Sequence, residues 1–219
     1  GFITFKYQIR DRHSDYNLDL KITNSTEGQI QAGFAAMSIT PEIVDTWNDV
    51  DNNFEYEPKK GDTFNDNNNN GEFDAYWIAG FHSSRAANGV HDSLWARTMI
   101  IDDGTTRIAM VSLDAIGFFH DQVVDIREKL PAGLNIDYCM IASTHVHEAP
   151  DLMGIWGNSH FKSGVNPAYL ELVINQAILS VETAVKNMEP VTLHFSKDEK
   201  NAQILVKDTR KQYGAKISC

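Results

Sequence analysis

A long amphipathic helix near the C-terminus constrains the fold more than any other feature. Asn166 followed by Pro167 is a strong helix start, because the Asn side chain can cap the first N–H groups and proline fits the first helical position. Apolar residues then recur at a period near 3.6 as far as Pro190, which ends the pattern. They are Leu170, Val173, Ile174, Ala177, Ile178, Val181, Ala184, Val185 and Met188. A one-sided helix of this length needs a partner layer.

The remaining apolar segments predict that layer. In chain order we predict a weakly committed segment over 1–30, a core strand over 31–40, a β-hairpin around Asp103-Gly104, a helix over 121–130, and strands over 138–143 and 191–196. Asp-Gly between two β-type runs is a strong hairpin signal. This order predicts an α/β fold, a single layered domain over 1–219 with a mixed β-sheet flanked by helices and no internal repeat.

Charge and composition exclude several classes of protein. The chain has 30 acidic and 19 basic residues, a net charge of −11, which argues against a nucleic-acid partner. No run of 18 apolar residues predicts a transmembrane segment, and we interpret a signal peptide as absent or already removed. Cys139 and Cys219 lie in different settings and indicate no disulfide framework. Residues 45–74 form an acidic, Asn-rich insertion with six Asp, three Glu and two Lys, −7 of the net charge.

The insertion ends in the pattern of a calcium-binding loop. D-x-[DN]-x-[DN]-G begins at Asp66 and places Gly71 at the bend. The predicted Ca²⁺ ligands are Asp62, Asp66, Asn68, Asn70, Glu72 and Asp74. Trp77 stands at the twelfth position, so another carboxylate must close the site, and Asp49 and Asp51 are more distant candidates than Asp62. The alternative is a solvated Asn/Asp tract. A calcium loop favours a secreted, periplasmic or cell-surface location.

Two histidines follow the predicted strand over 138–143. His145 and His147 are two residues apart, so in an extended chain both imidazoles point to the same side and can approach one ion. The end of a core strand is also where α/β proteins place ligands. The alternative is a pair of loop histidines satisfied by hydrogen bonds.

A third group of polar residues surrounds the predicted hairpin. Asp114 ends an apolar run, so we expect it at the carboxyl edge of a strand, where it can orient a zinc-bound histidine or bind the ion itself. The alternative is a cap on the helix that begins near residue 120. His91, Asp92 and Arg97 precede this run.

Four segments together resemble the neutral/alkaline non-lysosomal ceramidase family, at its N-terminal catalytic domain. They are AGFAAMSITPE, WIAGF, GVHDSLWARTMIIDDGTTRIAMVSLDAIGF and MIASTHVHEAPD, which occur in the family's order within residues 32–160. The chain departs from the family motif at Glu148-Ala149, where relatives have Ser-Gly. The family's catalytic domain is also far longer than 219 residues, which favours the N-terminal part of such an enzyme or a natural truncation.

The resemblance implies a zinc-dependent hydrolase that cleaves the amide of ceramide or a related acyl amide or ester. It implies zinc at His145, with His147 as a second ligand or a contact to substrate or water, and it implies His147, Asp114 and His91 as catalytic residues. Further zinc ligands would come from segments outside this sequence. Trp77 and Trp156 are candidates to line an apolar substrate groove, or are ordinary core residues. The competing hypothesis is a non-catalytic, calcium-stabilised extracellular module that keeps the fold.

Overall fold

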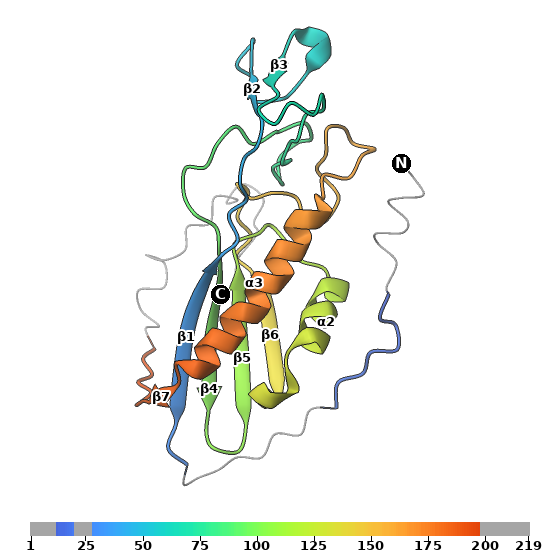
Figure 1. Cartoon of the computed structure of the whole chain (residues 1–219). Coiled ribbons are helices and arrows are strands. Elements are labelled where there is room, and N and C mark those ends of the chain that lie inside the picture. The colour runs from blue at the N-terminus through green and yellow to red at the C-terminus, as the bar shows by residue number, and fades with distance from the viewer. Residues whose placement is uncertain (1–11, 20–27, 198–219) are drawn as a thin grey trace, which may run out of the picture.

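The computed structural model describes residues 12–19 and 28–197, so most of the segment predicted over 1–30 lies outside the described residues. Its main element is a five-stranded sheet in the order β6-β5-β4-β1-β7 (Figure 1). The strands are β1 (Gln31–Ser38), β4 (Trp95–Asp102), β5 (Arg107–Leu113), β6 (Tyr138–Ser143) and β7 (Glu189–Pro190). Only β5 and β6 are parallel, and the other neighbours are antiparallel. The predicted mixed sheet is confirmed.

Two helices, α2 (His120–Lys129) and α3 (Pro167–Lys186), pack on the sheet side by side (Figure 1). The side-chain oxygen of Asn166 accepts the N–H groups of Ala168 and Tyr169, which confirms the predicted helix start. At Gly33 of β1 a Cβ atom would lie 2.0 Å from the carbonyl oxygen of Ala184, so glycine is what lets α3 approach the strand so closely. By length and composition α3 is the one helix of the described residues that could span a membrane, but it buries its apolar stripe against the sheet.

The predicted hairpin joins β4 to β5. Asp103 accepts the N–H groups of Thr105 and Thr106, and Gly104 has a φ of +88°. Side chains of the two strands alternate between a buried face beneath the helices and a more open face. On the open face Phe34 and Met140 are 60% and 43% exposed, and no helix of the described residues covers them.

The strand predicted over 191–196 is wrong. The last strand is Glu189–Pro190, two residues earlier, and residues 191–197 belong to no strand. Proline cannot donate to a ladder, and the bond that follows it, from the Val191 N–H to the Ile30 carbonyl, already lies before the first residue of β1. The β-type pattern at the end of the described chain therefore lacks the partner that would make it a strand.

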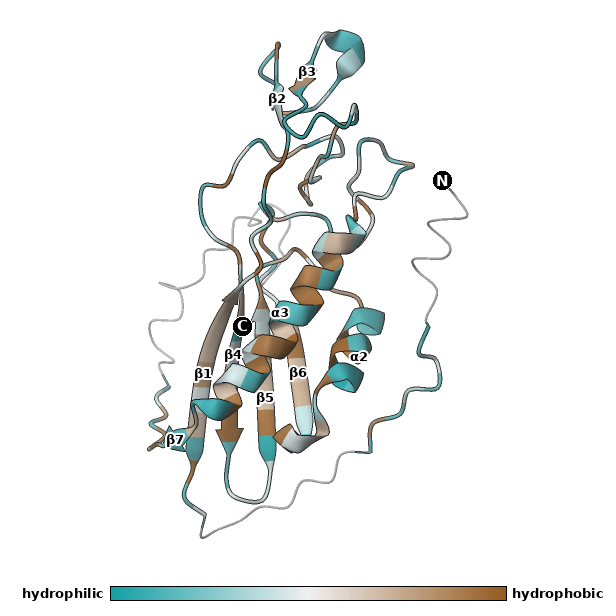
Figure 2. Cartoon of the chain, viewed as in Figure 1, coloured by the Kyte–Doolittle hydropathy of each residue, from teal (hydrophilic) through white to brown (hydrophobic). Residues whose placement is uncertain are grey.

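The acidic insertion forms a separate two-stranded sheet beyond the upper end of the main sheet (Figure 1). It pairs β2 (Thr46–Asn48) with β3 (Thr63–Asn65), and a short 3₁₀ turn, Pro58–Lys60, lies between them. Figure 2 shows apolar residues gathered on the strands and α3, while this insertion is largely hydrophilic. Its packed apolar side chains are aromatic: Trp47 is 5% exposed and packs on Tyr56, and Phe64 stacks on Phe73. A small aromatic cluster and hydrogen bonds therefore hold the insertion together.

Candidate functional site

The candidate site lies at the edge of the sheet where β1, β5 and β6 all end. Asp114 directly follows β5 and Thr144 directly follows β6. The Thr144 N–H donates to Leu113 and the His145 N–H donates to Ala115, so the chain after β6 stays attached to the chain after β5. The expected position of Asp114 at a carboxyl edge is confirmed. The same edge carries the histidine pair.

The two imidazoles face each other through their Nε2 atoms, which are 3.4 Å apart. Their rings are nearly perpendicular, with centroids 4.9 Å apart. Nδ1 of His145 lies 2.7 Å from the carbonyl oxygen of Ile116, which can only accept, so Nδ1 carries the proton and Nε2 presents a lone pair. Two nitrogens on a tetrahedral zinc, each about 2.05 Å from it, are about 3.4 Å apart. The separation of the two Nε2 atoms is therefore the one that two imidazoles bound to one zinc ion would have.

His147 is oriented differently from His145. Its Nδ1 atom is buried without a hydrogen-bond partner, so it lacks the acceptor that Ile116 gives to His145. Its ring instead packs against Phe81, with ring centroids 4.9 Å apart, and against Gly80. Both neighbours lie at the tip of the loop over residues 76–87, which runs antiparallel to residues 149–151.

Asp114 is held by three donors. Its Oδ2 atom accepts from Arg97 at 2.8 Å and from the Trp95 N–H at 2.9 Å, and Oδ1 lies 3.4 Å from the Thr144 hydroxyl. These bonds tie β4, β5 and the chain after β6 together. The structure thus places Asp114 at the same edge as the histidines, paired with Arg97 rather than with either imidazole.

A cavity of about 690 Å³ opens at this edge. Its polar lining includes Asp114, Thr144, Glu148, His91 and Asp92. The side chains of His91 and Asp92 are 98% and 90% exposed, so these two residues sit at its rim. Its apolar lining comes from Pro41, Ile43, Ile78, Val90, Leu94, Val146 and Pro150. The cavity therefore adjoins the histidine loop through Val146, the residue between the two histidines.

Neither candidate tryptophan lines this cavity. Trp77 belongs to an aromatic cluster with Tyr56 and Phe73, and the Trp156 N–H donates to Asp151. The apolar lining that sequence reasoning missed is drawn from segments on both sides of the insertion. In the sequence, these lining residues could have been found only from their positions: Pro41, Leu94 and Pro150 all flank the predicted strands or motifs.

The insertion is an internal duplication, which corrects the expectation of no repeat. Residues 45–57 (DTWNDVDNNFEYE) and 62–74 (DTFNDNNNNGEFD) are identical at seven of thirteen positions. The two copies pair through β2 and β3, with Trp47 opposite its counterpart Phe64. On either side of this pair, a Thr of one copy lies opposite an Asn of the other: Thr46 with Asn65, and Thr63 with Asn48. Comparing the sequence with itself at an offset of 17 residues would have found the repeat.

The two copies share one loop conformation. In each, the aspartate after the strand accepts the N–H groups four and five residues on: Asp49 from Asn53 and Phe54, and Asp66 from Asn70 and Gly71. Asn52 and Asn69, at equivalent positions, have φ of 57° and 58°. The calcium-like turn at Asp66 thus has a structural twin at Asp49.

The structure separates Asp62 from the loop it was predicted to close. Asp62 accepts the N–H groups of Val50 and Glu57, which belong to the first copy. Its counterpart Asp45 accepts those of Asn67 and Asp74 in the second copy. Each copy therefore supports its twin. The other predicted ligands, Asp66, Asn68, Asn70, Glu72 and Asp74, lie within one turn, where Asp74 accepts from the side chains of Asn68 and Asn70.

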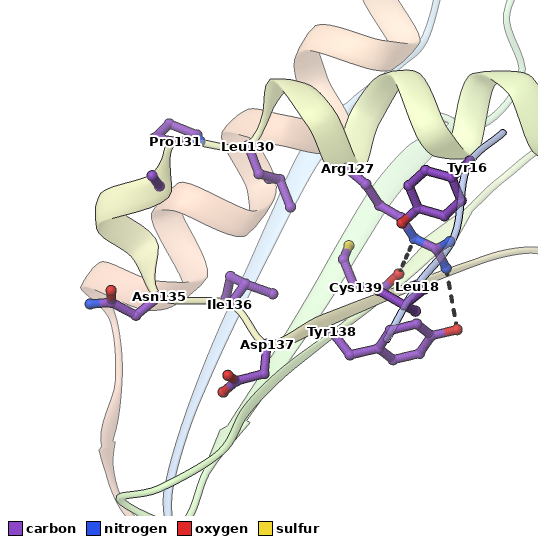
Figure 3. Close-up of a pocket in the computed structure, with 11 residues that line it drawn as sticks. Tyr16, Leu18, Arg127, Leu130, Pro131, Asn135, Ile136, Asp137, Tyr138 and Cys139 are labelled. Carbon is purple, nitrogen blue, oxygen red and sulfur yellow. Dashed lines mark hydrogen bonds between the residues drawn. The ribbon is translucent and has the colours of Figure 1, made fainter. Parts of the chain in front are cut away.

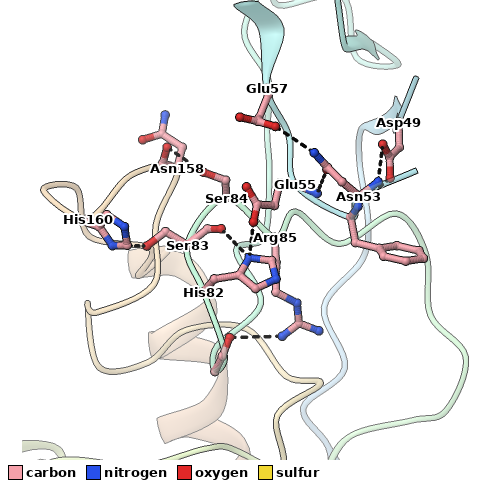
Figure 4. A network of polar contacts seen from close by, with 12 residues as sticks. Asp49, Asn53, Glu55, Glu57, His82, Ser83, Ser84, Arg85, Asn158 and His160 are labelled. Carbon is pink, nitrogen blue, oxygen red and sulfur yellow. Dashed lines mark hydrogen bonds and ion pairs between the residues drawn. The ribbon is translucent and has the colours of Figure 1, made fainter. Parts of the chain in front are cut away.

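The first copy contacts the loop beside the histidines. Glu55 and His82 form an ion pair, drawn as a dashed line in Figure 4, with Oε1 and Nδ1 3.0 Å apart. The Tyr56 N–H donates to the Ser84 carbonyl. The adjacent Ser83 hydroxyl lies 3.3 Å from Nδ1 of His160. The insertion and the site are thus joined by the loop over residues 76–87.

A second cavity, of about 380 Å³, lies at the opposite end of β6. Figure 3 shows Arg127 donating to the Cys139 carbonyl and to the Tyr138 hydroxyl there. Within residues 12–19 and 28–197, no group of three or more His, Cys, Asp or Glu side chains is arranged to hold a metal ion, here or at the histidine pair. The histidine loop thus contributes two imidazole donors.

No family model matches the sequence, and no curated protein matches it significantly. Solved structures do match its fold, and two of them are ceramidases. One is neutral ceramidase from Pseudomonas aeruginosa, with a TM-score of 0.51 and 18% identity over 75% of this chain and 22% of that chain. A ceramidase complexed with C2 matches with a TM-score of 0.52 and 17% identity, over the same shares of the two chains.

These likenesses show that the chain has the fold of part of a ceramidase, in agreement with the resemblance seen in the four sequence segments. The chain spans about a fifth of the length of those structures, 22% of each.

Proposed function

We propose that this chain is a ceramidase-like hydrolase that uses zinc to cleave an acyl amide or ester, with ceramide or a related lipid as substrate. The observation that carries the proposal is the convergence of the His145 and His147 Nε2 atoms at 3.4 Å on a ceramidase-like frame. The Ile116 carbonyl already selects the tautomer of His145 that a metal requires.

His145 and His147 would hold the zinc ion together with at least one further protein ligand. Among residues 12–19 and 28–197 no third His, Cys, Asp or Glu side chain is arranged with them to hold an ion. A bound zinc ion would acidify a water molecule and stabilise charge on the substrate carbonyl oxygen. The apolar lining of the adjoining cavity would hold an acyl or long-chain base. Asp114, fixed by Arg97, would accept a hydrogen bond from a substrate hydroxyl or amide at the cavity wall.

Metal content and hydrolysis test this proposal together. Equilibrium dialysis against micromolar zinc should load about one zinc per chain, and His145→Ala should remove it. His194→Ala is the matched control, because His194 is exposed in the segment that follows β7. Hydrolysis of a fluorogenic N-acyl amide should follow the zinc. A chain that binds no zinc, or loses it equally in both variants, would refute the proposed site.

We further propose that the duplicated turns bind Ca²⁺, which would stabilise the insertion. Each turn presents oxygens at alternate positions, Asp66, Asn68 and Asn70 in one and Asp49, Asp51 and Asn53 in the other. The specific observation in favour is that the duplication repeats the whole alternation and its backbone conformation. If the chain binds calcium but has no hydrolase activity, the competing function, a non-catalytic calcium-stabilised module, is supported. Calcium binding favours a secreted or periplasmic location.

Thermal unfolding with and without calcium tests this second proposal. Ligand that binds only the folded state raises the melting temperature by mass action. Asp66→Ala with Asp74→Ala should remove the shift due to the second turn, and Asp49→Ala that due to the first. Magnesium at the same concentration is the control ion. If calcium does not raise the melting temperature of the parent chain, the proposal is refuted and the turns are held by hydrogen bonds alone.

A further inference from the structure

We infer that Arg85 is a positioning residue for His147: it clamps the loop over residues 76–87 to the histidine loop, so that the two Nε2 atoms meet. The inference deepens the proposed function, because it explains how the second imidazole of that site is oriented. Of the two measurements that test it, one needs bound metal and therefore rests on the zinc proposal, and the other is made without metal.

The starting point is the asymmetry of the two histidines. His145 has an acceptor for its Nδ1 atom, the usual means by which a metal-binding imidazole is oriented. The Nδ1 atom of His147 is buried and has no hydrogen-bond partner. Some other interaction must therefore set the direction of the His147 ring.

Packing supplies one part of that interaction. A Cβ atom at Gly80 would lie 2.4 Å from Nδ1 of His147, so the ring rests directly on the backbone there. Gly80 and Phe81 have φ of +93° and +60°, and Phe81 remains 75% exposed while its ring packs on His147. A strained, exposed phenylalanine needs a compensating contact, and the His147 ring provides it.

Arg85 supplies the other part. Its Nη1 atom lies within hydrogen-bond distance of three carbonyl oxygens, those of Ala79 at 3.4 Å, Gly80 at 3.3 Å and His147 at 3.2 Å. Its guanidinium also lies over the Phe81 ring, 5.4 Å from the centroid. One side chain thus holds the loop tip and the backbone of His147 in a fixed relation.

Glu148 completes the clamp. Nη2 of Arg85 donates to both carboxylate oxygens of Glu148, at 2.8 and 3.0 Å. The Arg85 side chain is only 12% exposed, while that of Glu148 is 65% exposed, so the carboxylate holds the guanidinium mainly through the geometry of its two bonds. Glu148 is where this chain departs from the Ser-Gly of the ceramidase motif, so the departure supplies the partner that anchors Arg85.

The test compares Arg85→Ala with Arg127→Ala. Arg127 is the matched control because it makes similar bonds, to the Cys139 carbonyl and the Tyr138 hydroxyl, at the other end of β6. Titration with Co²⁺ alone, followed by its visible absorption, should show about 10–100-fold weaker binding in Arg85→Ala. Arg127→Ala should bind Co²⁺ as the parent does. Arg85→Lys should restore part of the affinity, because an ammonium can still donate to the carbonyl oxygens.

A metal-free readout separates this inference from the proposed function. The Phe81 ring should displace the His147 ring-proton resonances in the parent chain, and Phe81→Ala defines their undisplaced position. Arg85→Ala should move them toward that position, while Arg127→Ala should not. If the parent binds no Co²⁺, the zinc proposal fails, and the resonances alone decide the role of Arg85. Unchanged His147 resonances in Arg85→Ala would overturn the inference.

Discussion

The sheet with its two helices and the loops beyond its carboxyl edge are held together in different ways. The first region is closed by apolar side chains that solvent does not reach, such as Ile100, Val111 and Val173. In the second region single polar side chains each organise several backbone groups. Asp151 accepts four N–H groups, and Asp45 and Asp62 accept two each.

The difference determines how each region responds to change. An apolar core spreads its stabilisation over many contacts, so trimming one side chain removes a part that the neighbours partly compensate. Neighbours cannot compensate in this way when a polar residue that accepts several N–H groups is removed. Each N–H group left buried without an acceptor adds its own desolvation cost to the loss of stability. The second region also carries the candidate site, so its polar residues determine where the imidazoles lie.

The largest expected effect is at Asp151, which is fully buried. Asp151→Asn leaves one oxygen and places an NH₂ group against donors that need an acceptor. Burial raises the pKa of this carboxyl, while its bonds to Met153, Trp156, Gly154 and Gly164 lower it. We expect a loss of about 3–4 kcal/mol in the free energy of unfolding, measured by urea denaturation.

The control for this prediction comes from the apolar region. Ile100→Val removes one buried methylene beneath α3 and should cost about 1 kcal/mol. If Asp151→Asn costs no more than Ile100→Val, the contrast between the two regions is wrong, because the loops would then tolerate the loss of a multiple acceptor.

Cys139 tests the same contrast in the apolar region, because it is a titratable group among buried apolar side chains. Burial raises the pKa of its thiol from 9.0 to about 11, and the nearby Arg127 lowers it by less. As the pH rises past 9, the unfolded thiol ionises before the folded one, so stability that is present below pH 9 is lost. The loss should approach about 2–3 kcal/mol near pH 11.

Comparison with Cys139→Ala isolates the part of the pH dependence that comes from the Cys139 thiol. The difference in unfolding free energy between the parent and Cys139→Ala should be constant from pH 7 to pH 8.5 and should fall between pH 9 and pH 11. A difference independent of pH would show that the thiol ionises equally well in the folded state, and hence that this part of the core admits water.

The duplicated insertion offers a matched pair within the polar region. Asp62→Ala and Asp45→Ala each remove an acceptor of two N–H groups, and each should cost about 2 kcal/mol. Hydrogen exchange should resolve them. Asp62→Ala should expose the amides of Val50 and Glu57, in the copy that precedes it. The reciprocal variant should expose those of Asn67 and Asp74. If each variant instead loosened its own copy, the crossed support would be refuted.

The same contrast explains what the sequence could predict. The strand Tyr138–Ser143 was predicted at its observed bounds and the long helix at its observed start, because apolar periodicity and end signals record them locally. The hairpin at Asp103-Gly104 was predicted for the same reason. The helix ends at Lys186, before the Pro190 that was expected to end it, and Glu189–Pro190 pair with β1 instead. The strand over 191–196 failed, because an edge strand depends on a partner elsewhere in the chain rather than on its own pattern.

The site was only partly predictable. The spacing of His145 and His147 indicates that both can face one point, and the structure brings their Nε2 atoms together. The roles of Arg85 and Asp45 were not predictable, because each acts on backbone groups distant in sequence. Proximity in sequence favoured the turn at Asp66 as the partner of Asp62, while the pairing of β2 with β3 brings its carboxylate to backbone groups of the other copy.

The smallest expected effect is at the start of α3, where a polar residue serves the apolar region. Asn166 accepts two N–H groups at 3.0 and 3.1 Å; the first bond is exposed and the second only partly buried, so water can replace much of what is lost. Asn166→Ala should therefore cost only about 1 kcal/mol, and Asn166→Asp should cost almost nothing, since aspartate caps equally well. Urea denaturation of the three proteins measures both. The two residues differ in how deeply the accepting oxygen is buried. If Asn166→Ala lowered the free energy of unfolding as much as Asp151→Asn does, burial of the acceptor would not determine the cost of removing it.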